Sequence, residues 1–289
     1  MDVSIIVPIE GTADSSYLAA CLRGILAQRY DEGRIETVLV WYGSTSRERP
    51  GGLDLPAGLD VREFETAGES PDVARNLAAA AAHGEVFLFT EPGCVPEPGW
   101  VAGHVSLMRE GKVAVGVGHV APARSTRLLE IFNAYEQVRD AWVFAGASWR
   151  HYFGRAKNMA VSRVRFETHG PFAEVLRGAD SKLVQKVARE VSCDEVAHVS
   201  SAVVRQQSIR DLPTCFRDRY GHGHALQTHQ SAHAAPIALR DRVALFRETV
   251  KRSGYSPFDA LRLFLVLSVG VWVFRAGEWA GSLSRRIKR

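Results

Sequence analysis

The sequence predicts an α/β protein with a doubly wound, mostly parallel sheet, flanking helices and a C-terminal helical appendage. Three observations lead to this fold class. Short β-prone apolar runs at residues 3–8, 36–42 and 86–90 are typical of strands buried on both faces. Segments with helical spacing of apolar residues separate these runs, which implies parallel pairing through right-handed crossovers. From residue 235 onward, the composition changes to charged and apolar helical segments.

Composition limits the classes of protein to consider. With 289 residues, 46% of them hydrophobic, the chain can bury a large core, and we expect one main domain at residues 1–230 and an appendage at 236–289. The net charge of +4 is modest, and no run interleaves aromatic with basic residues, so we expect no nucleic-acid partner. Four dispersed cysteines without a Cys-x-x-Cys pair predict reduced thiols in the cytoplasm. The opening Met1-Asp2 leads directly into a strand, so no signal peptide is predicted.

The N-terminal elements follow each other in order. A helix at residues 15–28 comes after the first strand, because its apolar residues recur at helical spacing. The strand at 36–42 ends at Gly43, a glycine- and proline-rich loop occupies 48–57, and a third strand is expected at 59–64.

The stretch at residues 85–100, EVFLFTEPGCVPEPGW, is the centre of the predicted domain. A helix that begins at Ser70, a good N-cap, and Pro71 leads into its strand. The strand breaks at Pro92-Gly93, directly after Glu91. A buried strand that ends in an acidic turn is how an open α/β sheet presents a ligand-binding edge, and the alternative is an ordinary strand-to-helix loop.

The second half continues the alternation of strands and helices. We expect a helix at 100–108 and strands at 113–117 and 195–204. The amphipathic segment 125–143 is helical, and it either flanks an acceptor cleft or packs its aromatic stripe into the core.

Several motifs, taken in order, resemble those of the family 2 glycosyltransferases. They are the opening Val-Ser-Ile-Ile-Val-Pro, the Ala-Arg-Asn helix start, the strand followed by Val-Pro-Glu-Pro-Gly-Trp, Asn158-Met159-Ala160, and Arg-x-x-Tyr-Gly-x-Gly. The resemblance covers roughly residues 3–225, and its motifs are specific in combination. It implies a GT-A-type fold and inverting transfer of a sugar from a nucleotide-diphosphate donor to a hydroxyl.

The resemblance also implies roles for individual residues. Asp180 matches the position of the general base, which must be a carboxylate because the acceptor hydroxyl is deprotonated as it attacks. The alternative for Asp180 is a helix N-cap. The other implied positions are the donor-binding Pro8, Glu10, Tyr42, Arg75, Glu91, Arg219 and His222, and the acceptor-side Lys157 and Asn158.

Two departures from the family pattern matter. Trp41-Tyr42 replaces an Asp-Asp pair, and these rings either stack on a base or fill the strand end. Glu91-Pro92-Gly93 replaces Asp-X-Asp, so Glu91 is left as a weak single ligand for Mg²⁺ or Mn²⁺. Whether the protein requires a metal is therefore open. The histidines at 222, 224, 229 and 233 fit no closed zinc template.

The C-terminal segment has two helical patterns. A charged helix is expected at 239–251 and an apolar one at 258–274, whose uninterrupted apolar core is shorter than the roughly 20 residues of a membrane span. We expect it to lie in the membrane interface, with Trp272 and Trp279 at headgroup level and the terminal Arg and Lys residues near anionic lipid. The alternative is a helix packed on the main domain or on a second copy in a homodimer.

Taken together, these features predict a peripheral enzyme at the inner face of the cell membrane. Its donor would be a sugar nucleotide, and its acceptor a lipid-linked or polysaccharide molecule of the cell envelope. The rival hypothesis is a noncatalytic relative that binds a sugar nucleotide or a partner enzyme, because three carboxylates of the family pattern are missing.

Overall fold

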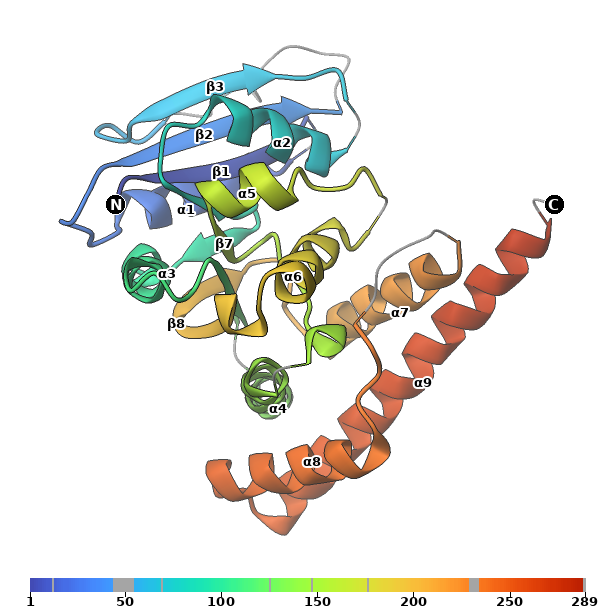
Figure 1. Ribbon diagram of the computed structural model, residues 1–289. Coiled ribbons are helices and arrows are strands. Elements are labelled where there is room, and N and C mark those ends of the chain that lie inside the picture. Colours follow the sequence, from blue (N-terminus) through green and yellow to red (C-terminus); the bar gives the residue numbers. More distant parts are fainter. Residues whose placement is uncertain are drawn as a thin grey trace.

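The computed structural model describes residues 1–11, 13–43, 55–68, 70–124, 126–146, 148–175, 177–228 and 234–287. Their centre is one eight-stranded mixed sheet with the strand order β3-β2-β1-β4-β7-β6-β8-β5, and helices cover it (Figure 1). The predicted fold class, a doubly wound α/β sheet with flanking helices, is confirmed. Most of the loop predicted at residues 48–57 lies outside the described residues.

The first half of the sheet is parallel. β1 (Val3–Glu10) lies between β2 (Ile35–Tyr42) and β4 (Val86–Phe89), and β3 (Val61–Glu65) pairs with β2 at the edge. Because these strands run in one direction, their carboxyl ends meet at the same edge of the sheet. The residues that follow β1, β2 and β4 are thereby brought together.

The second half of the sheet reverses direction. β7 (Met159–Ser162) runs antiparallel to both β4 and β6 (Val115–Pro122), β8 (Val196–Gln206) is parallel to β6, and β5 (Cys94–Pro96) is antiparallel to β8. An antiparallel strand begins where its neighbour ends. The residues just before β7 therefore lie beside the turn that follows β4.

Six helices connect these strands, with capping that the sequence indicates. The side chain of Ser70 accepts a hydrogen bond from the Asp72 amide at the start of α2, with Pro71 in the first turn, as predicted. The helices are α1 (Ser15–Leu26), α2 (Pro71–Ala81), α3 (Trp100–Arg109), α4 (Arg127–Ala145), α5 (Arg163–His169) and α6 (Ala179–Glu190), with short 3₁₀ turns η1 (Trp149–His151) and η2 (Cys193–Glu195).

Two apolar layers, one on each face of the sheet, form the core. Alternate residues of β1 point to opposite faces, so Ile6 packs in the cluster with α2 and α6, whereas Ile5 and Val7 pack with α1 and α3. All three side chains are fully buried. This arrangement explains why the strand is a continuous apolar run rather than an alternating one.

Three further helices follow the sheet: α7 (Leu212–Thr228), α8 (Leu239–Ser253) and α9 (Pro257–Ile287). Leu245 of α8 and Leu263 of α9 pack against α4, so these helices rest on the main body. The C-terminal boundary predicted for the apolar helix, residue 274, is wrong, because α9 continues without a break through Gly277. A glycine inside a helix costs only about 1 kcal/mol, which packing elsewhere along α9 offsets.

Helices α7 and α9 lie side by side (Figure 1) in contact through their backbones. A side chain at Gly277 would collide with the Tyr220 carbonyl of α7, and one at Gly223 would collide with the Phe274 carbonyl of α9. Glycine at these positions permits the close approach, as small residues do between membrane helices.

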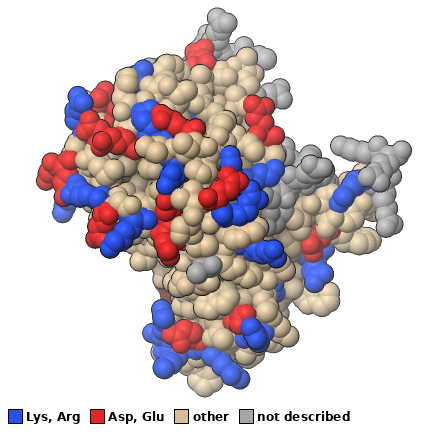
Figure 2. Space-filling model, in the orientation of Figure 1, with Lys and Arg blue, Asp and Glu red and all other residues tan. Residues whose placement is uncertain are grey.

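The opposite side of α9 exposes large apolar side chains. Trp272 is 76% exposed and Trp279 is 72% exposed. By length and composition, residues 257–285 suffice to cross a membrane, with a mean hydropathy of 1.7 in the most apolar window. Exposed cations of α8 lie at the lower end of the molecule, where Figure 2 shows several Lys and Arg side chains.

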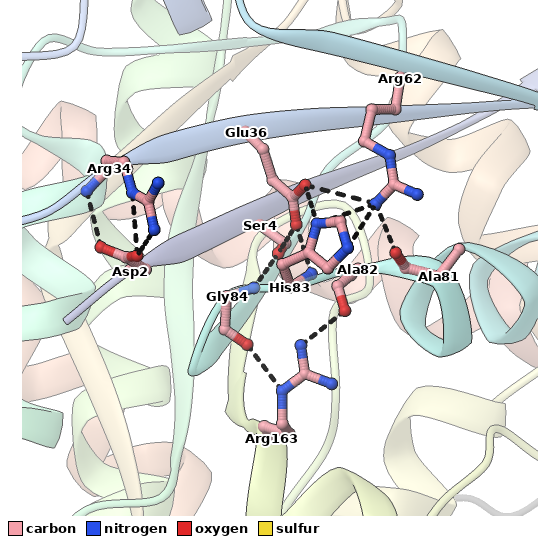
Figure 3. A network of polar contacts seen from close by, with 10 residues as sticks. All are labelled: Asp2, Ser4, Arg34, Glu36, Arg62, Ala81, Ala82, His83, Gly84 and Arg163. Atoms are coloured by element: carbon pink, nitrogen blue, oxygen red, sulfur yellow. Dashed lines mark hydrogen bonds and ion pairs between the residues drawn. The ribbon is translucent and has the colours of Figure 1, made fainter.

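A buried carboxylate ties the amino-terminal ends of the strands together (Figure 3). Glu36 at the start of β2 accepts hydrogen bonds from the Ser4 hydroxyl and the His83 amide, both at 2.5 Å. Arg62 lies 3.6 Å from the same carboxylate. Burial would raise the pKa of Glu36, but the hydrogen bonds from His83 and Ser4 lower it overall. The network lies at the edge of the sheet opposite the carboxyl ends of β1, β2 and β4, so we assign it to stability.

We predict that Glu36→Gln lowers the free energy of unfolding by about 1–3 kcal/mol at neutral pH, because it removes a buried charged acceptor. The folded-state pKa of Glu36 lies below the ordinary value of 4.5. Its contribution is therefore complete above that value and is lost as the pH falls through the folded-state pKa. Denaturant unfolding of both proteins across this range should show the difference shrinking in acid. The exposed Glu85→Gln serves as control, and a difference that persists below the folded-state pKa would contradict the assignment.

Candidate functional site

Three predicted residues meet at the carboxyl edge of the parallel strands. Glu10 ends β1, Tyr42 ends β2, and Glu91 follows β4. Pro8 is buried within β1, opposite Val40, so its side chain does not reach this edge. The prediction that Pro8 contacts a ligand is therefore wrong for its side chain, since a residue in mid-strand is covered by the flanking helices.

An ion triplet forms the floor of this edge. The buried Arg75 of α2 donates to Asp72 at 2.7 Å and to Glu91 at 2.6 Å. Burial alone would lower the pKa of Arg75, but these carboxylates raise it overall. The side chain of Glu91 remains 40% exposed and takes this bond through Oε1. Arg75 is therefore committed to holding Glu91 in place, and Glu91 is the member of the triplet that faces outward.

Tyr42 is close enough to the same charged groups for them to affect its pKa. Burial, followed by the negative charge of Glu10, raises its pKa to about 12. The phenol therefore stays protonated at neutral pH and is a hydrogen-bond donor. Trp41 on the other face of β2 donates to Glu63 at 3.3 Å. Both rings are partly buried and pack against the core, Trp41 on one face of the sheet and Tyr42 on the other.

Asp180 belongs to this charge cluster, although it comes from α6. Burial raises the pKa of Asp72 against the opposing charge of Arg75, and the Asp180 carboxylate adds to the rise. Asp180 is the second residue of α6, whose N-cap is Gly178 with φ 86°, so the alternative role of N-cap is wrong. Its carboxylate is half-buried rather than sealed.

The loop before β7 holds Asp180 in position. The Ala156 amide donates to its Oδ2 at 3.0 Å, and the Gly154 amide donates to the hydroxyl of Ser181 at 3.0 Å. A side chain at Gly154 would collide with the backbone of Asp180, so only glycine permits this approach. The contact between the loop and the helix start orients the carboxylate toward the edge of the sheet.

The two residues predicted on the acceptor side have different surroundings. The Lys157 ammonium donates to Gln206 at 3.0 Å, and the Lys157 carbonyl accepts from Thr90 at the end of β4. Asn158 is fully buried, and its amide donates to the carbonyl groups of His119 and Ala202. The prediction of ligand contact is therefore wrong for Asn158, because all of its polar atoms hold the core together.

The basic run of α7 separates into two environments. Arg219 donates to Glu136 of α4 at 3.1 Å and lies over the Phe132 ring, on the side of α7 that faces α4. Desolvation by the surrounding protein and the charges of Arg177 and Lys157 lower the pKa of His222, whereas Asp218 and Asp180 act in the opposite direction. Arg219 is therefore held by α4, whereas His222 keeps an exposed surface. His229 and His233 lie outside the described residues.

The chemistry of the donor set does not favour a protein-built metal site at Glu91. Glu91 supplies one carboxylate, and Arg75 already holds it at 2.6 Å. A side chain at Gly93 would meet nothing within 4 Å, so the space for a second carboxylate is open but unfilled. A divalent cation usually takes several oxygen ligands, and substrate phosphates would have to supply the remainder.

A second cluster of metal-ligand types lies behind α4. Ligand atoms of His119, Asp140 and His198 come within 4.8 Å of one another. However, Arg139 and Arg155 both donate to the Asp140 carboxylate and, against the opposing effect of burial, lower its pKa to about 2. Two guanidinium groups on the only anionic ligand repel a divalent cation, so we assign no metal here.

Sequence reasoning missed the buried network on α4. Glu136, Asp140 and Arg155 link this helix to the loop before β7. The two acidic residues lie one helical turn apart on an otherwise apolar face, and this spacing was the signal available in the sequence.

Comparison with known proteins defines the class of fold. No family model matches the chain, and no curated protein matches its sequence. Among solved structures, the mannosyltransferase PcManGT from Pyrobaculum calidifontis, in complex with GDP-Man and Mn²⁺, is similar over 96% of this chain and 73% of its own, with 17% identity and a TM-score of 0.60. The chain has a GT-A-type fold, as found in glycosyltransferases.

Two structures of S. aureus TarS residues 1–349 extend the comparison. One, at 13% identity, is similar over 100% of this chain and 92% of its own, with a TM-score of 0.52. The other, in complex with UDP-GlcNAc, is similar over 100% and 93%, with 12% identity and a TM-score of 0.52. These likenesses establish the fold and leave the activity of the present chain to its own residues.

We predict that Gly93→Asp creates a cation site. The new carboxylate would enter open space two residues from Glu91, and a second charged ligand should strengthen Mn²⁺ binding by about tenfold or more. Isothermal titration calorimetry with Mn²⁺ measures this gain directly. Gly99→Asp is a matched control, because its side chain would also meet nothing within 4 Å. Equal Mn²⁺ affinity in the two variants would show that Glu91 is not oriented toward position 93.

Proposed function

We propose that this protein transfers a sugar from a nucleotide-diphosphate donor to a hydroxyl group of its acceptor with inversion at the anomeric carbon. The observation that carries the proposal is the position of Asp180. Its carboxylate lies in the same charge cluster as Asp72, Arg75 and Glu91, at the carboxyl edge of a GT-A-type sheet. The glycosyltransferases with similar folds support the choice of reaction.

In the proposed reaction, Asp180 accepts the proton of the acceptor hydroxyl. The acceptor oxygen forms a bond to the anomeric carbon while the bond from that carbon to the diphosphate breaks, and the nucleoside diphosphate leaves. Two amide contacts hold the loop and Asp180 together, so the base needs little reorganisation in the transition state. Tyr42 and Glu10 border the nucleotide, and Arg75 and Glu91 border its ribose and diphosphate or a metal ion.

Charge on the departing diphosphate needs a counterpart. Glu91 with Arg75 does not form a cation site by itself, so we derive no step that passes through a metal. We assign His222 to the leaving group as a neutral hydrogen-bond donor, because its pKa is lowered by desolvation and by the charge of Arg177. Arg219, which the sequence also indicated, is held by Glu136 and contributes to the positive potential only.

The C-terminal helices support a location at a membrane surface, with α8 and α9 as an appendage to a catalytic unit that ends near residue 230. One face of α9 exposes apolar side chains, namely Phe258, Leu261, Phe264, Leu265, Val269, Trp272 and Trp279. Beside it, α8 exposes the cations Arg240, Arg242, Arg247, Lys251 and Arg252. Apolar area together with cations favours an anionic lipid surface. We therefore propose peripheral binding at the inner face of the cell membrane, with a lipid-linked or polysaccharide acceptor of the cell envelope.

A noncatalytic sugar-nucleotide-binding protein is the second candidate. Gly93 and Tyr42 favour it, because they stand where the glycosyltransferase pattern has carboxylates. The contacts that hold Asp180 favour an enzyme. Gly154 and the Ala156 amide position this carboxylate, and nucleotide binding alone would not require them.

We predict that Asp180→Asn lowers the rate of sugar transfer or donor hydrolysis by about 10²–10⁴-fold, because an amide cannot accept the proton. A panel of nucleotide-diphosphate sugars is assayed by release of the nucleoside diphosphate, and donor binding is followed separately by thermal shift. Asp31→Asn, at an exposed loop position, is the control. Activity that survives Asp180→Asn would remove this residue from the mechanism. Binding without turnover of any donor would favour the noncatalytic alternative.

We predict that Trp272→Ser combined with Trp279→Ser reduces sedimentation with anionic vesicles several-fold, because both rings are exposed on one face of α9. Neutral vesicles should bind the unchanged protein more weakly. Trp142→Ser on α4 controls for loss of an exposed tryptophan. If light scattering instead shows a dimer that the double substitution dissociates, then α9 forms a homodimer interface and the membrane proposal fails.

A further inference from the structure

A cavity of about 150 Å³ lies between the sheet, α4 and α7, beside the carboxylate cluster. One helical face of α4 forms its first wall, through Leu129, Phe132, Asn133 and Glu136. Cys215 of α7 lies on the opposite wall. In other proteins, a cavity of about this size can hold a benzene-sized molecule, so this one has room for part of a substrate.

The polar end of the cavity adjoins the candidate catalytic centre. Lys157 lines it, and the carbonyl of this residue accepts from Thr90, directly before Glu91. Gln206 also lines the cavity. It pairs with Cys94 on the neighbouring strand β5, and Cys94 lies three residues after Glu91. A molecule in the cavity would therefore extend toward the same edge of the sheet as Asp180.

The charge around the cavity is positive. Arg139 and Arg155 pair with Asp140, and Arg219 pairs with Glu136. The Lys157 ammonium contacts the neutral side-chain oxygen of Gln206. Of the residues that line the cavity, Arg155 and Lys157 are cations and Glu136 is an anion, which leaves the lining with a net charge of +1. Lys157 is the cation in it with no carboxylate contact among the described residues.

The lining combines apolar and polar side chains. Val120, Leu129, Phe132 and Ile209 are apolar, whereas Asn133, Glu136, Arg155 and Lys157 offer polar or charged atoms. A wholly polar ligand would leave the apolar lining uncovered, and a wholly apolar one would leave the Lys157 charge without a counter-ion. The lining therefore matches a molecule with an anionic group attached to an apolar segment.

We propose that this cavity binds the acceptor, and that the acceptor is an amphiphile with an anionic group against Lys157 and an apolar chain along Phe132. This inference rests on the proposed function and specifies its acceptor class. Cys215 of the cavity wall belongs to α7, which is in backbone contact with α9, so one wall of the cavity is connected to the helix that we assign to the membrane.

The test uses decyl phosphate, below its micelle concentration, as the probe in isothermal titration calorimetry of the full chain. Lys157→Gln should weaken its binding about tenfold, which is the effect of losing one charged hydrogen bond. Asn133→Phe, which fills the cavity without changing its charge, should abolish binding. Lys112→Gln, whose side chain is 81% exposed, should bind as the unchanged protein does.

Three outcomes would overturn the inference. Inorganic phosphate that binds as tightly as decyl phosphate would indicate a simple anion site. Decyl glucoside that binds equally well, with no effect of Lys157→Gln, would indicate an apolar surface alone. A nucleoside diphosphate that displaces the probe competitively would assign Lys157 to the donor. Probe binding without any transferase activity would contradict the proposed function but not the cavity, so the two failures are distinguishable.

Discussion

The site depends on one buried cation. Arg75 is almost completely removed from solvent, and a guanidinium group in that position is costly unless anions surround it. Asp72 and Glu91 provide those anions, from α2 itself and from the turn after β4. The ion triplet therefore connects a helix to the end of the central strand. Glu91 must present one carboxylate oxygen to Arg75. This contact therefore makes Glu91 the carboxylate of the triplet that faces outward at the edge of the sheet.

This constraint explains how a site with few carboxylates can remain organised. In an open turn, a single glutamate adopts many rotamers, but the contact with Arg75 restricts Glu91 to those that reach α2. The second organising contact is on the other side of the edge, where the Ala156 amide and Gly154 hold the start of α6. Two independent anchors thus define the positions of Glu91 and Asp180. Both anchors are present although Tyr42 and Gly93 carry no carboxylate.

The sequence predicted the sheet well and the site only in part. The apolar runs at β1, β2 and β4 are buried on both faces, so their composition alone identified them. The short β7 and its antiparallel direction depend on contacts distant in sequence, which local patterns do not encode. Asn158 was misassigned for a similar reason: a polar residue in a motif can satisfy buried carbonyl groups as readily as a ligand. The apolar helix predicted at 258–274 is too short, because α9 continues to Ile287 and α7 packs against it at Gly277.

The backbone contact between α7 and α9 has a mechanical consequence. With Gly223 set against the Phe274 carbonyl and Gly277 against that of Tyr220, neither helix can slide or roll on the other without steric overlap. The pair must move as a rigid lever. A displacement of α9 would therefore carry α7 with it, including Cys215 in the wall of the cavity beside Lys157.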